Sequence, residues 1–154
     1  MVGFIGLGSN VGDREGHLRE GLAALSTAGV AVEAESSLWE TEPVGNAGPG
    51  WFLNMAARVR TGLAPEDLLE LCLAIEREHG RDRSGLPGGP RTLDLDLLDF
   101  EGVVRATPRL ILPHPRLHER RFVLAPLAEL DPRFGAALAA LRDPHVVRLY
   151  SAPR

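Results

Sequence analysis

Six segments that follow one another in the order strand, helix, strand, strand, helix, strand predict an α+β fold, the ferredoxin-like sandwich with a βαββαβ core and extra C-terminal helices. Four of these segments have the short apolar or alternating patterns of strands, and the two longer ones have apolar residues at helical spacing. Stretches rich in glycine and proline separate them. The length of 154 residues suits a single domain over residues 1–154.

The first strand and the first helix have clear sequence boundaries. Residues 2–7 form a short apolar run, which is typical of a buried strand. Asp13 can cap a helix over residues 14–28, and Gly29 can end it because glycine tolerates the left-handed backbone conformation. The apolar stripe of this helix consists of Leu18, Leu22 and Leu25.

Two strands joined by a loop come next. Residues 30–39 alternate between apolar and polar side chains, so we expect the second strand there. Residues 42–50 contain two prolines and three glycines, which predicts a loop. A third strand over residues 52–61 would direct four side chains to one buried face: Leu53, Met55, Ala57 and Val59. Pro65 then begins a helix that we expect to end near His79.

The second half of the chain contains a loop, a strand and two short helices. Residues 81–90 show no periodicity and end in glycines and prolines, which predicts a mobile loop. Residues 93–100 form the fourth expected strand. Short helices are expected over residues 121–129 and 136–141, with Pro132 between them.

Composition excludes several classes of protein. The net charge of −4 does not favour binding to nucleic acid or to an anionic membrane. No apolar run is long enough to cross a bilayer, and the N-terminal residues lack the pattern of a signal peptide. We therefore expect a cytoplasmic monomer that contacts neither nucleic acid nor membrane.

Cysteine and lysine usage narrows the possible chemistry further. The single cysteine, Cys72, excludes an internal disulfide and a cysteine-based zinc site, and its helical neighbours predict that it is buried. The chain has no lysine: all 17 of its lysine-or-arginine residues are arginine. A P-loop lysine and a Schiff-base lysine are therefore excluded. Any phosphate would be held by arginine, by metal or by main-chain N–H groups.

The strongest local motif is Gly-Pro-Arg-Thr-Leu-Asp-Leu-Asp over residues 89–96. On a strand, Asp94 and Asp96 project from one face, roughly 7 Å apart along the backbone. Two such carboxylates can bind magnesium, which usually takes one or two carboxylates together with substrate phosphates. A strand with a solvated acidic face has the same pattern, but Arg91 beside the two acids favours a phosphoryl-transfer site.

Two further segments concentrate basic residues. Arg81 and Arg83 alternate in the expected mobile loop and could close over a polyphosphate, although a solvated charged loop has the same pattern. Residues 113–122 contain three arginines and two histidines, whose spacing matches no zinc signature. We therefore expect phosphate contacts from this segment. Glu76, near the end of its helix, could hydrogen-bond a ligand.

A glycine-rich segment over residues 6–12 invites comparison with nicotinamide-binding proteins. Val11 stands where the third glycine of the G-x-G-x-x-G pattern would be, and no helix separates the next two strands. A tight turn is the favoured interpretation.

Taken in order, these motifs resemble those of the 6-hydroxymethyl-7,8-dihydropterin pyrophosphokinase family over nearly the whole chain. The residues that carry the resemblance are Gly8-Ser9-Asn10, Thr41-Glu42-Pro43-Val44-Gly45, Phe52-Leu53-Asn54, Gly89-Pro90-Arg91-Thr92-Leu93-Asp94-Leu95-Asp96, Pro113-His114-Pro115-Arg116, Arg120 and Phe122. The resemblance implies transfer of a pyrophosphoryl group from ATP to a reduced pterin, with AMP as the leaving group.

The resemblance also implies roles for individual residues. Two magnesium ions would be held by Asp94 and Asp96. The pterin would be bound by Thr41, Pro43, Val44, Gly45, Phe52, Asn54 and Phe122, with the two phenylalanines stacking on its faces. The catalytic contacts to phosphate would come from Arg81, Arg83 and Arg91, acting with the two aspartates. ATP would be bound by Glu76, Arg91, His114, Arg116 and Arg120.

The chain departs from the family at one place. Family members usually have an arginine and an aromatic residue before the Gly-Pro-Arg motif, where this chain has Pro87 and Gly88. The aromatic residue helps the mobile loop to close over the pterin, and Trp51 is a candidate replacement. A weakened relative that binds ATP or pterin without turnover is therefore the alternative hypothesis.

Overall fold

The computed structural model describes residues 1–42, 51–79, 92–143 and 145–150. Its strands are β1 (Val2–Ser9), β2 (Ala31–Glu35), β3 (Trp39–Thr41), β4 (Phe52–Arg60), β5 (Asp94–Phe100), β6 (Arg105–Ala106), β7 (Ile111–Leu112) and β8 (Val147–Leu149). Its helices are α1 (Arg14–Thr27), α2 (Pro65–Glu78), α3 (Arg121–Leu130) and α4 (Arg133–Ala140). None of the helices in these ranges is both long enough and apolar enough to span a membrane.

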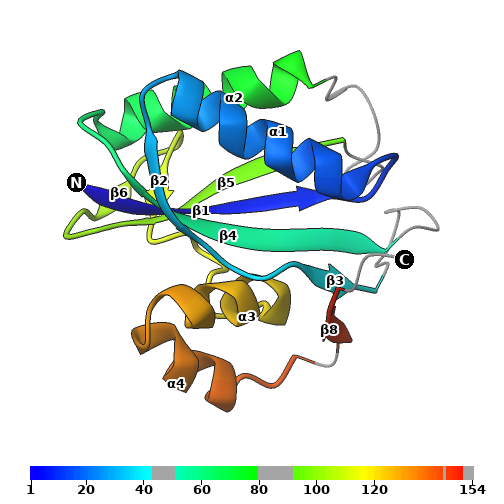
Figure 1. The fold of residues 1–154 in the computed structure, drawn as a ribbon. Helices are drawn as coiled ribbons and strands as arrows, with labels where there is room; N and C mark the ends of the chain where they lie inside the picture. Colours follow the sequence, from blue (N-terminus) through cyan, green and yellow to red (C-terminus); the bar gives the residue numbers. More distant parts are fainter. Residues whose placement is uncertain (43–50, 80–91, 144, 151–154) are drawn as a thin grey trace.

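An antiparallel sheet forms the centre of this mixed α/β structure. Its strand order is β5-β1-β4-β3-β8, and β2 pairs with β4 beside β3. Helices α1 and α2 lie on one face of the sheet, and α3 and α4 lie on the other (Figure 1). Strands β6 and β7 form a separate small sheet.

The face under α1 and α2 is a continuous apolar core. The expected stripe of α1 is buried there, as are the four residues predicted on one face of β4. Asp13 caps α1 as predicted, since its carboxylate accepts a hydrogen bond from the Gly16 N–H at 3.1 Å. Gly29 follows the end of this helix with a φ of +91°, a conformation that favours glycine.

The opposite face carries a smaller core. The ring of Phe4 on β1 meets the ring of Phe134 on α4 edge to face, with 5.7 Å between their centroids. Leu124 and Leu127 of α3 complete the contact with the sheet. These residues cover only part of this face, and a cavity lies over another part of it.

The single strand expected over residues 30–39 is wrong, because the structure has two strands there, β2 and β3, both paired with β4. Between them, Ser36 donates its N–H to the Ala56 carbonyl, and its hydroxyl accepts the Ala56 N–H; both distances are 2.9 Å. A side chain therefore replaces a main-chain acceptor, and the regular ladder is interrupted.

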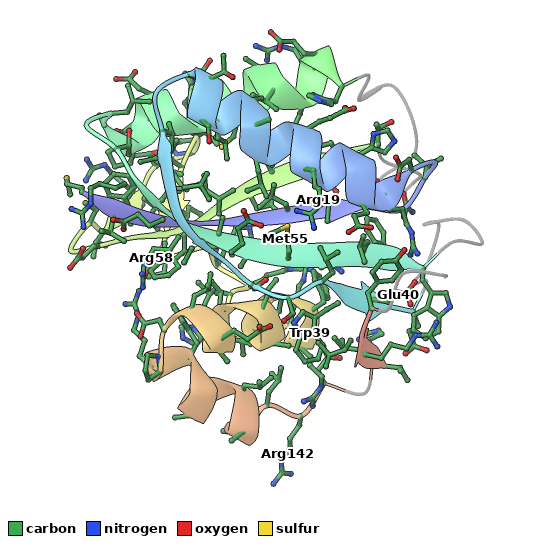
Figure 2. All side chains as sticks on the ribbon, viewed as in Figure 1. Arg19, Trp39, Glu40, Met55, Arg58 and Arg142 are labelled. Carbon is green, nitrogen blue, oxygen red and sulfur yellow. The ribbon has the colours of Figure 1, made fainter. Side chains whose placement is uncertain are left out.

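Glu129 ties helix α3 to this interrupted edge. Its carboxylate accepts hydrogen bonds from the N–H and the hydroxyl of Ser37, at 3.1 and 2.7 Å, and from Trp39 Nε1 at 2.7 Å. Figure 2 shows Trp39 on the side of β3 that faces α3. The helix is thereby fixed against the strand that leads to Thr41.

The C-terminal part differs most from the sequence-based expectation. Helix α4 begins at Arg133 rather than at residue 136, because Pro132 already has helical φ and ψ angles of −57° and −26°. Strand β8 and the β6–β7 pair were not predicted, since two or three residues are too few to show a period.

Candidate active site

A cavity of about 920 Å³ lies on the α3/α4 side of the sheet. Its walls come from β1, β3, β4 and β5, from the segment that leads into α3, and from the chain just before β8. The lining residues are Gly6, Leu7, Gly8, Thr41, Glu42, Phe52, Asn54, Met55, Ala56, Asp94, Asp96, Leu98, His114, Arg116, Glu119, Arg120, Phe122, Val123, Asp143 and His145.

Strand β5 supplies the two carboxylates at this cavity. Asp94 and Asp96 both line it, while Leu93, Leu95 and Leu97 are buried in the core on the other side. The alternation that the sequence predicted is therefore confirmed. Asp96 is exposed and Asp94 is half-buried, so both lie where a ligand can reach them.

Glycines of β1 keep the floor of the cavity open. Gly8 pairs with Asp94 on one side and with Asn54 on the other. A Cβ atom at Gly8 would lie 2.9 Å from Asn54 Oδ1, closer than such atoms normally approach. The absence of a side chain at this position therefore leaves room for the Asn54 amide.

Asn54, Thr41 and Phe52 form a second part of the cavity, which combines one aromatic ring with two hydrogen-bonded polar side chains. Asn54 Nδ2 donates to Thr41 Oγ1 at 2.9 Å, and both residues are buried, at 8% and 4% exposed. Thr41 pairs with Phe52 across the β3–β4 ladder. A buried amide held by a hydroxyl has a fixed orientation, and it can offer its remaining polar groups to the edge of a ligand.

The start of α3 provides the opposite wall. Phe122 lies in the first turn of the helix, and the guanidinium carbon of Arg120 lies 5.4 Å from the centre of its ring. Burial lowers the pKa of the Arg120 guanidinium, and the positive charge of Arg116 lowers it further. The negative charges of Asp96, Glu119 and Asp143 act in the opposite direction and raise this pKa.

His114 is held by two hydrogen bonds. Its main-chain N–H donates to the Leu98 carbonyl at 2.8 Å, and its ring Nδ1 accepts a hydrogen bond from the main-chain N–H of Arg116 at 3.2 Å. Because Nδ1 acts as an acceptor, Nε2 carries the proton in the neutral ring. This segment thus adds a donor and a guanidinium to the cavity.

Glu76, expected near ATP, lies on α2. Its side chain is buried, and Oε2 accepts the Leu95 N–H at 2.9 Å. Leu95 lies between the two aspartates, so this bond fixes the strand that carries them. Glu76 is not part of the described cavity wall, and its contact with ATP stays a prediction.

Several predicted residues lie outside the part of the chain that the structure describes. These are Pro43, Val44 and Gly45 of the pterin set, Arg81, Arg83 and Arg91 of the phosphate set, and the unusual pair Pro87 and Gly88. The described members of both sets, except Glu76, line one cavity.

Four charged or titratable residues at the cavity were missed by sequence reasoning: Glu42, Glu119, Asp143 and His145. Glu42 and Glu119 lie inside motifs that were singled out for their neighbours. Asp143 and His145 lie beyond the last expected helix, and no local pattern marks them.

Trp51 and Cys72 lie away from the cavity wall as the structure describes it. Arg148 lies over the Trp51 ring, 3.8 Å from its centroid, and Arg14 donates to the Trp51 carbonyl at 2.8 Å. Cys72 is buried as expected, and burial, aided by Glu76 and Asp96, raises the pKa of its thiol to about 12.

Carboxylates outnumber guanidinium groups on the described wall. The carboxylates are Glu42, Asp94, Asp96, Glu119 and Asp143, and the guanidinium groups are Arg116 and Arg120. An anionic ligand would therefore need added positive charge. Among the described residues no group of three or more histidine, cysteine, aspartate and glutamate side chains could hold a metal ion. The pair Asp94 and Asp96 suits magnesium that takes its other ligands from phosphate and water.

Comparison with known proteins gives consistent matches. The model of the 7,8-dihydro-6-hydroxymethylpterin-pyrophosphokinase (HPPK) family matches residues 4–132. The chain is 52% identical over 151 residues to the 2-amino-4-hydroxy-6-hydroxymethyldihydropteridine pyrophosphokinase of Bacillus subtilis, covering 97% of this chain and 90% of that protein. It is 45% identical over 130 residues to the protein of the same name from Methylorubrum extorquens, covering 84% of this chain and 82% of that one.

Longer proteins also match. A folate synthesis bifunctional protein of Arabidopsis thaliana is 46% identical over 126 residues, and the match covers 82% of this chain but only 26% of that protein. A solved structure of an HPPK-DHPS protein in complex with substrates is similar with a TM-score of 0.69 at 11% identity. That similarity covers 90% of this chain and 45% of the solved one, and it concerns the fold alone.

Proposed function

This chain belongs to the 7,8-dihydro-6-hydroxymethylpterin-pyrophosphokinase family, and we propose that it transfers pyrophosphate from ATP to 6-hydroxymethyl-7,8-dihydropterin in folate biosynthesis. The products are AMP and the pterin diphosphate. One observation carries the proposal: a single cavity is lined by the carboxylates of Asp94 and Asp96 and by the rings of Phe52 and Phe122. We propose that the pterin occupies a slot between these two rings. A polyphosphate and a flat heterocycle can therefore bind next to each other.

The slot suits the pterin. Phe52 and Phe122 lie on different walls of the cavity, on β4 and α3, so a planar ring can stack between them. Asn54, oriented by Thr41, offers amide groups to the polar edge of the ring. Apolar faces with a few fixed polar groups are the usual composition of a selective small-molecule site.

The other half of the cavity suits ATP. Arg116 and Arg120 can contact phosphate oxygens, and His114 offers an Nε2 donor in its neutral form. Arg81, Arg83 and Arg91, which lie outside the described residues, are proposed to add the remaining positive charge. Two magnesium ions held by Asp94 and Asp96 would neutralise phosphate charge and align the reacting groups.

Transfer then requires mainly alignment. The hydroxyl of the pterin attacks the β-phosphorus of ATP and releases its proton to water. A bond from that oxygen to phosphorus forms, and the bond between the β-phosphorus and the α-phosphate oxygen breaks as AMP leaves. The aromatic slot fixes the pterin and the arginines fix the phosphates, so the two reactants meet in line. Charge that develops on the transferred group is met by groups already in place.

The proposal extends to the fold type. The strand order β5-β1-β4 with β2 paired to β4, and the helices α1 and α2 on one face, support assignment to the ferredoxin-like sandwich. Helices α3 and α4 are additions on the other face, and α3 contributes Phe122 and Val123 to the cavity wall.

An assay of AMP formation tests the function directly. Purified protein, ATP and magnesium should release AMP only when the reduced pterin is present, and EDTA should abolish the release. A protein that binds both ligands in calorimetry but releases no AMP would instead be the non-catalytic relative. Omission of pterin without any effect on AMP release would contradict the proposal.

A further inference from the structure

The chain beyond the family match contributes to the cavity. The HPPK family model matches residues 4–132, yet Asp143 and His145 line the same cavity as Phe122 and Asp96. Strand β8 follows them and pairs with β3, the strand that ends at Thr41. The C-terminal segment therefore contacts both the start of α3 and strand β3, two of the elements around the cavity.

Asp143 uses both carboxylate oxygens within the protein. Oδ2 accepts a hydrogen bond from the main-chain N–H of Arg121 at 3.0 Å. Oδ1 accepts one from the main-chain N–H of His145 at 3.0 Å and also contacts the ring Nδ1 of His145. Its side chain is 6% exposed. The neighbouring Arg142 points away from the protein into solvent (Figure 2). Asp143 is thus turned inward to the start of α3.

Helix α3 depends on this residue for its cap. Arg120 occupies the N-cap position, and its side chain makes no capping hydrogen bond. The first N–H groups of a helix have no partner within the helix, so they need an external acceptor. Asp143 supplies one from 22 positions along the chain. Arg121 Nη2 strengthens the junction with bonds to the carbonyls of Leu141 and Asp143, at 3.4 and 3.3 Å.

The carboxyl group of Asp143 favours its ionised form in this setting. Burial raises the pKa of its carboxyl, but the hydrogen bonds from Arg121 and His145 outweigh burial, and the pKa lies below its ordinary value. An ionised acceptor at a helix N-terminus is also favoured by the helix dipole.

We propose that Asp143 is a positioning residue for pyrophosphoryl transfer, which holds the first turn of α3 so that Arg120 and Phe122 face Asp96 and Phe52. Arg121, which it binds, stands between these two ligand-contacting residues. The effect of Asp143 on catalysis rests on the proposed function, whereas its effect on helix α3 does not. The effect of Asp143 on α3 itself can be measured without any substrate.

Three variants test the proposal by steady-state kinetics. Asp143→Ala removes the cap, and it should raise the KM for the pterin about fivefold, the factor that corresponds to loss of a typical N-cap. Asp143→Asn keeps an acceptor for the Arg121 N–H and should bring the KM back to within about twofold of the original, since asparagine caps helices about as well as aspartate.

Asp131→Ala is the matched control. Asp131 accepts the Arg133 N–H at 3.0 Å at the start of α4, so its loss removes the same kind of bond away from the cavity. It should lower the melting temperature about as much as Asp143→Ala and leave the KM unchanged. Equal KM values for the two alanine variants would overturn the proposal. So would an Asp143→Asn variant as impaired as Asp143→Ala, because the hydrogen bond to the Arg121 main-chain N–H would then not be what holds the first turn of α3.

Amide hydrogen exchange in the ligand-free protein decides the matter independently of activity. The amides of residues 121–124 should exchange about fivefold faster in Asp143→Ala, and at the original rate in Asp131→Ala. If the unaltered protein released no AMP, the proposed function would fail while this measurement still tested the cap. Unchanged exchange in Asp143→Ala would overturn the positioning role whatever the activity.

Discussion

Strand β1 presents Ile5 and Leu7 to one face of the sheet and Gly6 and Gly8 to the other. The same alternation continues in β5, where Leu95 faces the core and Asp96 faces the cavity. The face under α1 and α2 is filled with apolar side chains, whereas the face under α3 and α4 is filled only at one end. One set of strands therefore serves stability on one side and ligands on the other.

The packed face under α1 and α2 explains why the strands stay stable although their cavity face carries carboxylates and glycines. Carboxylates and glycines weaken a strand unless its other face is well packed. Here Leu7 precedes Gly8, and Leu95 and Leu97 flank Asp96. All three leucines are buried in the core, so both strands are packed on their other face. Substitutions on the cavity face should then alter function with little loss of stability, and substitutions on the core face should do the reverse.

The largest effect is expected at the two carboxylates. Asp96→Ala or Asp94→Ala should reduce pyrophosphoryl transfer on the order of a thousandfold, because each removes a charged group from the proposed metal clamp. The melting temperature should change little, since both side chains lie on the open face. AMP release at saturating magnesium measures the effect.

Glu101→Ala provides the control for this experiment. Glu101 is an exposed carboxylate that follows β5 directly, and its removal should leave AMP release unchanged. Near-normal activity in either aspartate variant would mean that the metal site is wrongly assigned.

A core substitution should have the opposite profile. Leu18→Ala on α1 removes a fully buried side chain from the other face, and it should lower the free energy of unfolding by about 3 kcal/mol. Pterin affinity of the folded protein should stay the same. Urea denaturation and calorimetry measure the two quantities. Leu63→Ala, at an exposed position, should cost about 0.5 kcal/mol or less.

A Leu18→Ala protein that stays folded but binds pterin poorly would contradict the division between the faces. It would mean that the core under α1 shapes the cavity through the sheet.

Sequence reasoning succeeded where the structural cause is local. The two-residue period of β5 separated Asp94 and Asp96 from the leucines between them, and this separation holds in the structure. The Asp13 cap and the end of α1 at Gly29 also depend on residues only a few positions away. The ligand roles of the site residues came from family resemblance, and they stay predictions.

The failures have non-local causes. The strand over residues 30–39 is interrupted because the Ser36 hydroxyl bonds the main chain of Ala56, 20 positions away. Asp143 escaped notice because its partner, Arg121, lies 22 positions earlier. A single sequence shows a serine and an aspartate at these positions, and it does not show what they face.

An intermediate effect is expected at the aromatic walls. Phe52→Ala and Phe122→Ala should each weaken pterin binding by about 1–3 kcal/mol through lost stacking and contact area. Affinity for a non-hydrolysable ATP analogue should change much less, because the arginines and the carboxylates remain. Calorimetry of each ligand separately gives both values.

Phe134→Ala is the matched aromatic control on the same face. Phe134 is buried against Phe4, so its loss should lower stability by about 3 kcal/mol or more and leave both affinities of the folded protein unchanged. Equal loss of pterin and nucleotide affinity in the Phe52 and Phe122 variants would instead mark these rings as ordinary structural residues.

The smallest and sharpest test makes the same substitution at two positions of β1 that face opposite ways. In Gly8→Ala the new Cβ would lie 2.9 Å from Asn54 Oδ1, so the Asn54 side chain, whose Nδ2 donates to Thr41, must shift. Pterin affinity should fall by about 1 kcal/mol, with a smaller change in stability.

In Gly3→Ala the Cβ would instead lie 3.3 Å from the Phe100 ring in the core. That variant should lose about 1 kcal/mol of stability and keep its pterin affinity. Thermal unfolding and pterin titration of both proteins give the four values. If both variants lost affinity equally, a shift of the whole strand would be the cause, and the two faces would be mechanically coupled rather than separate.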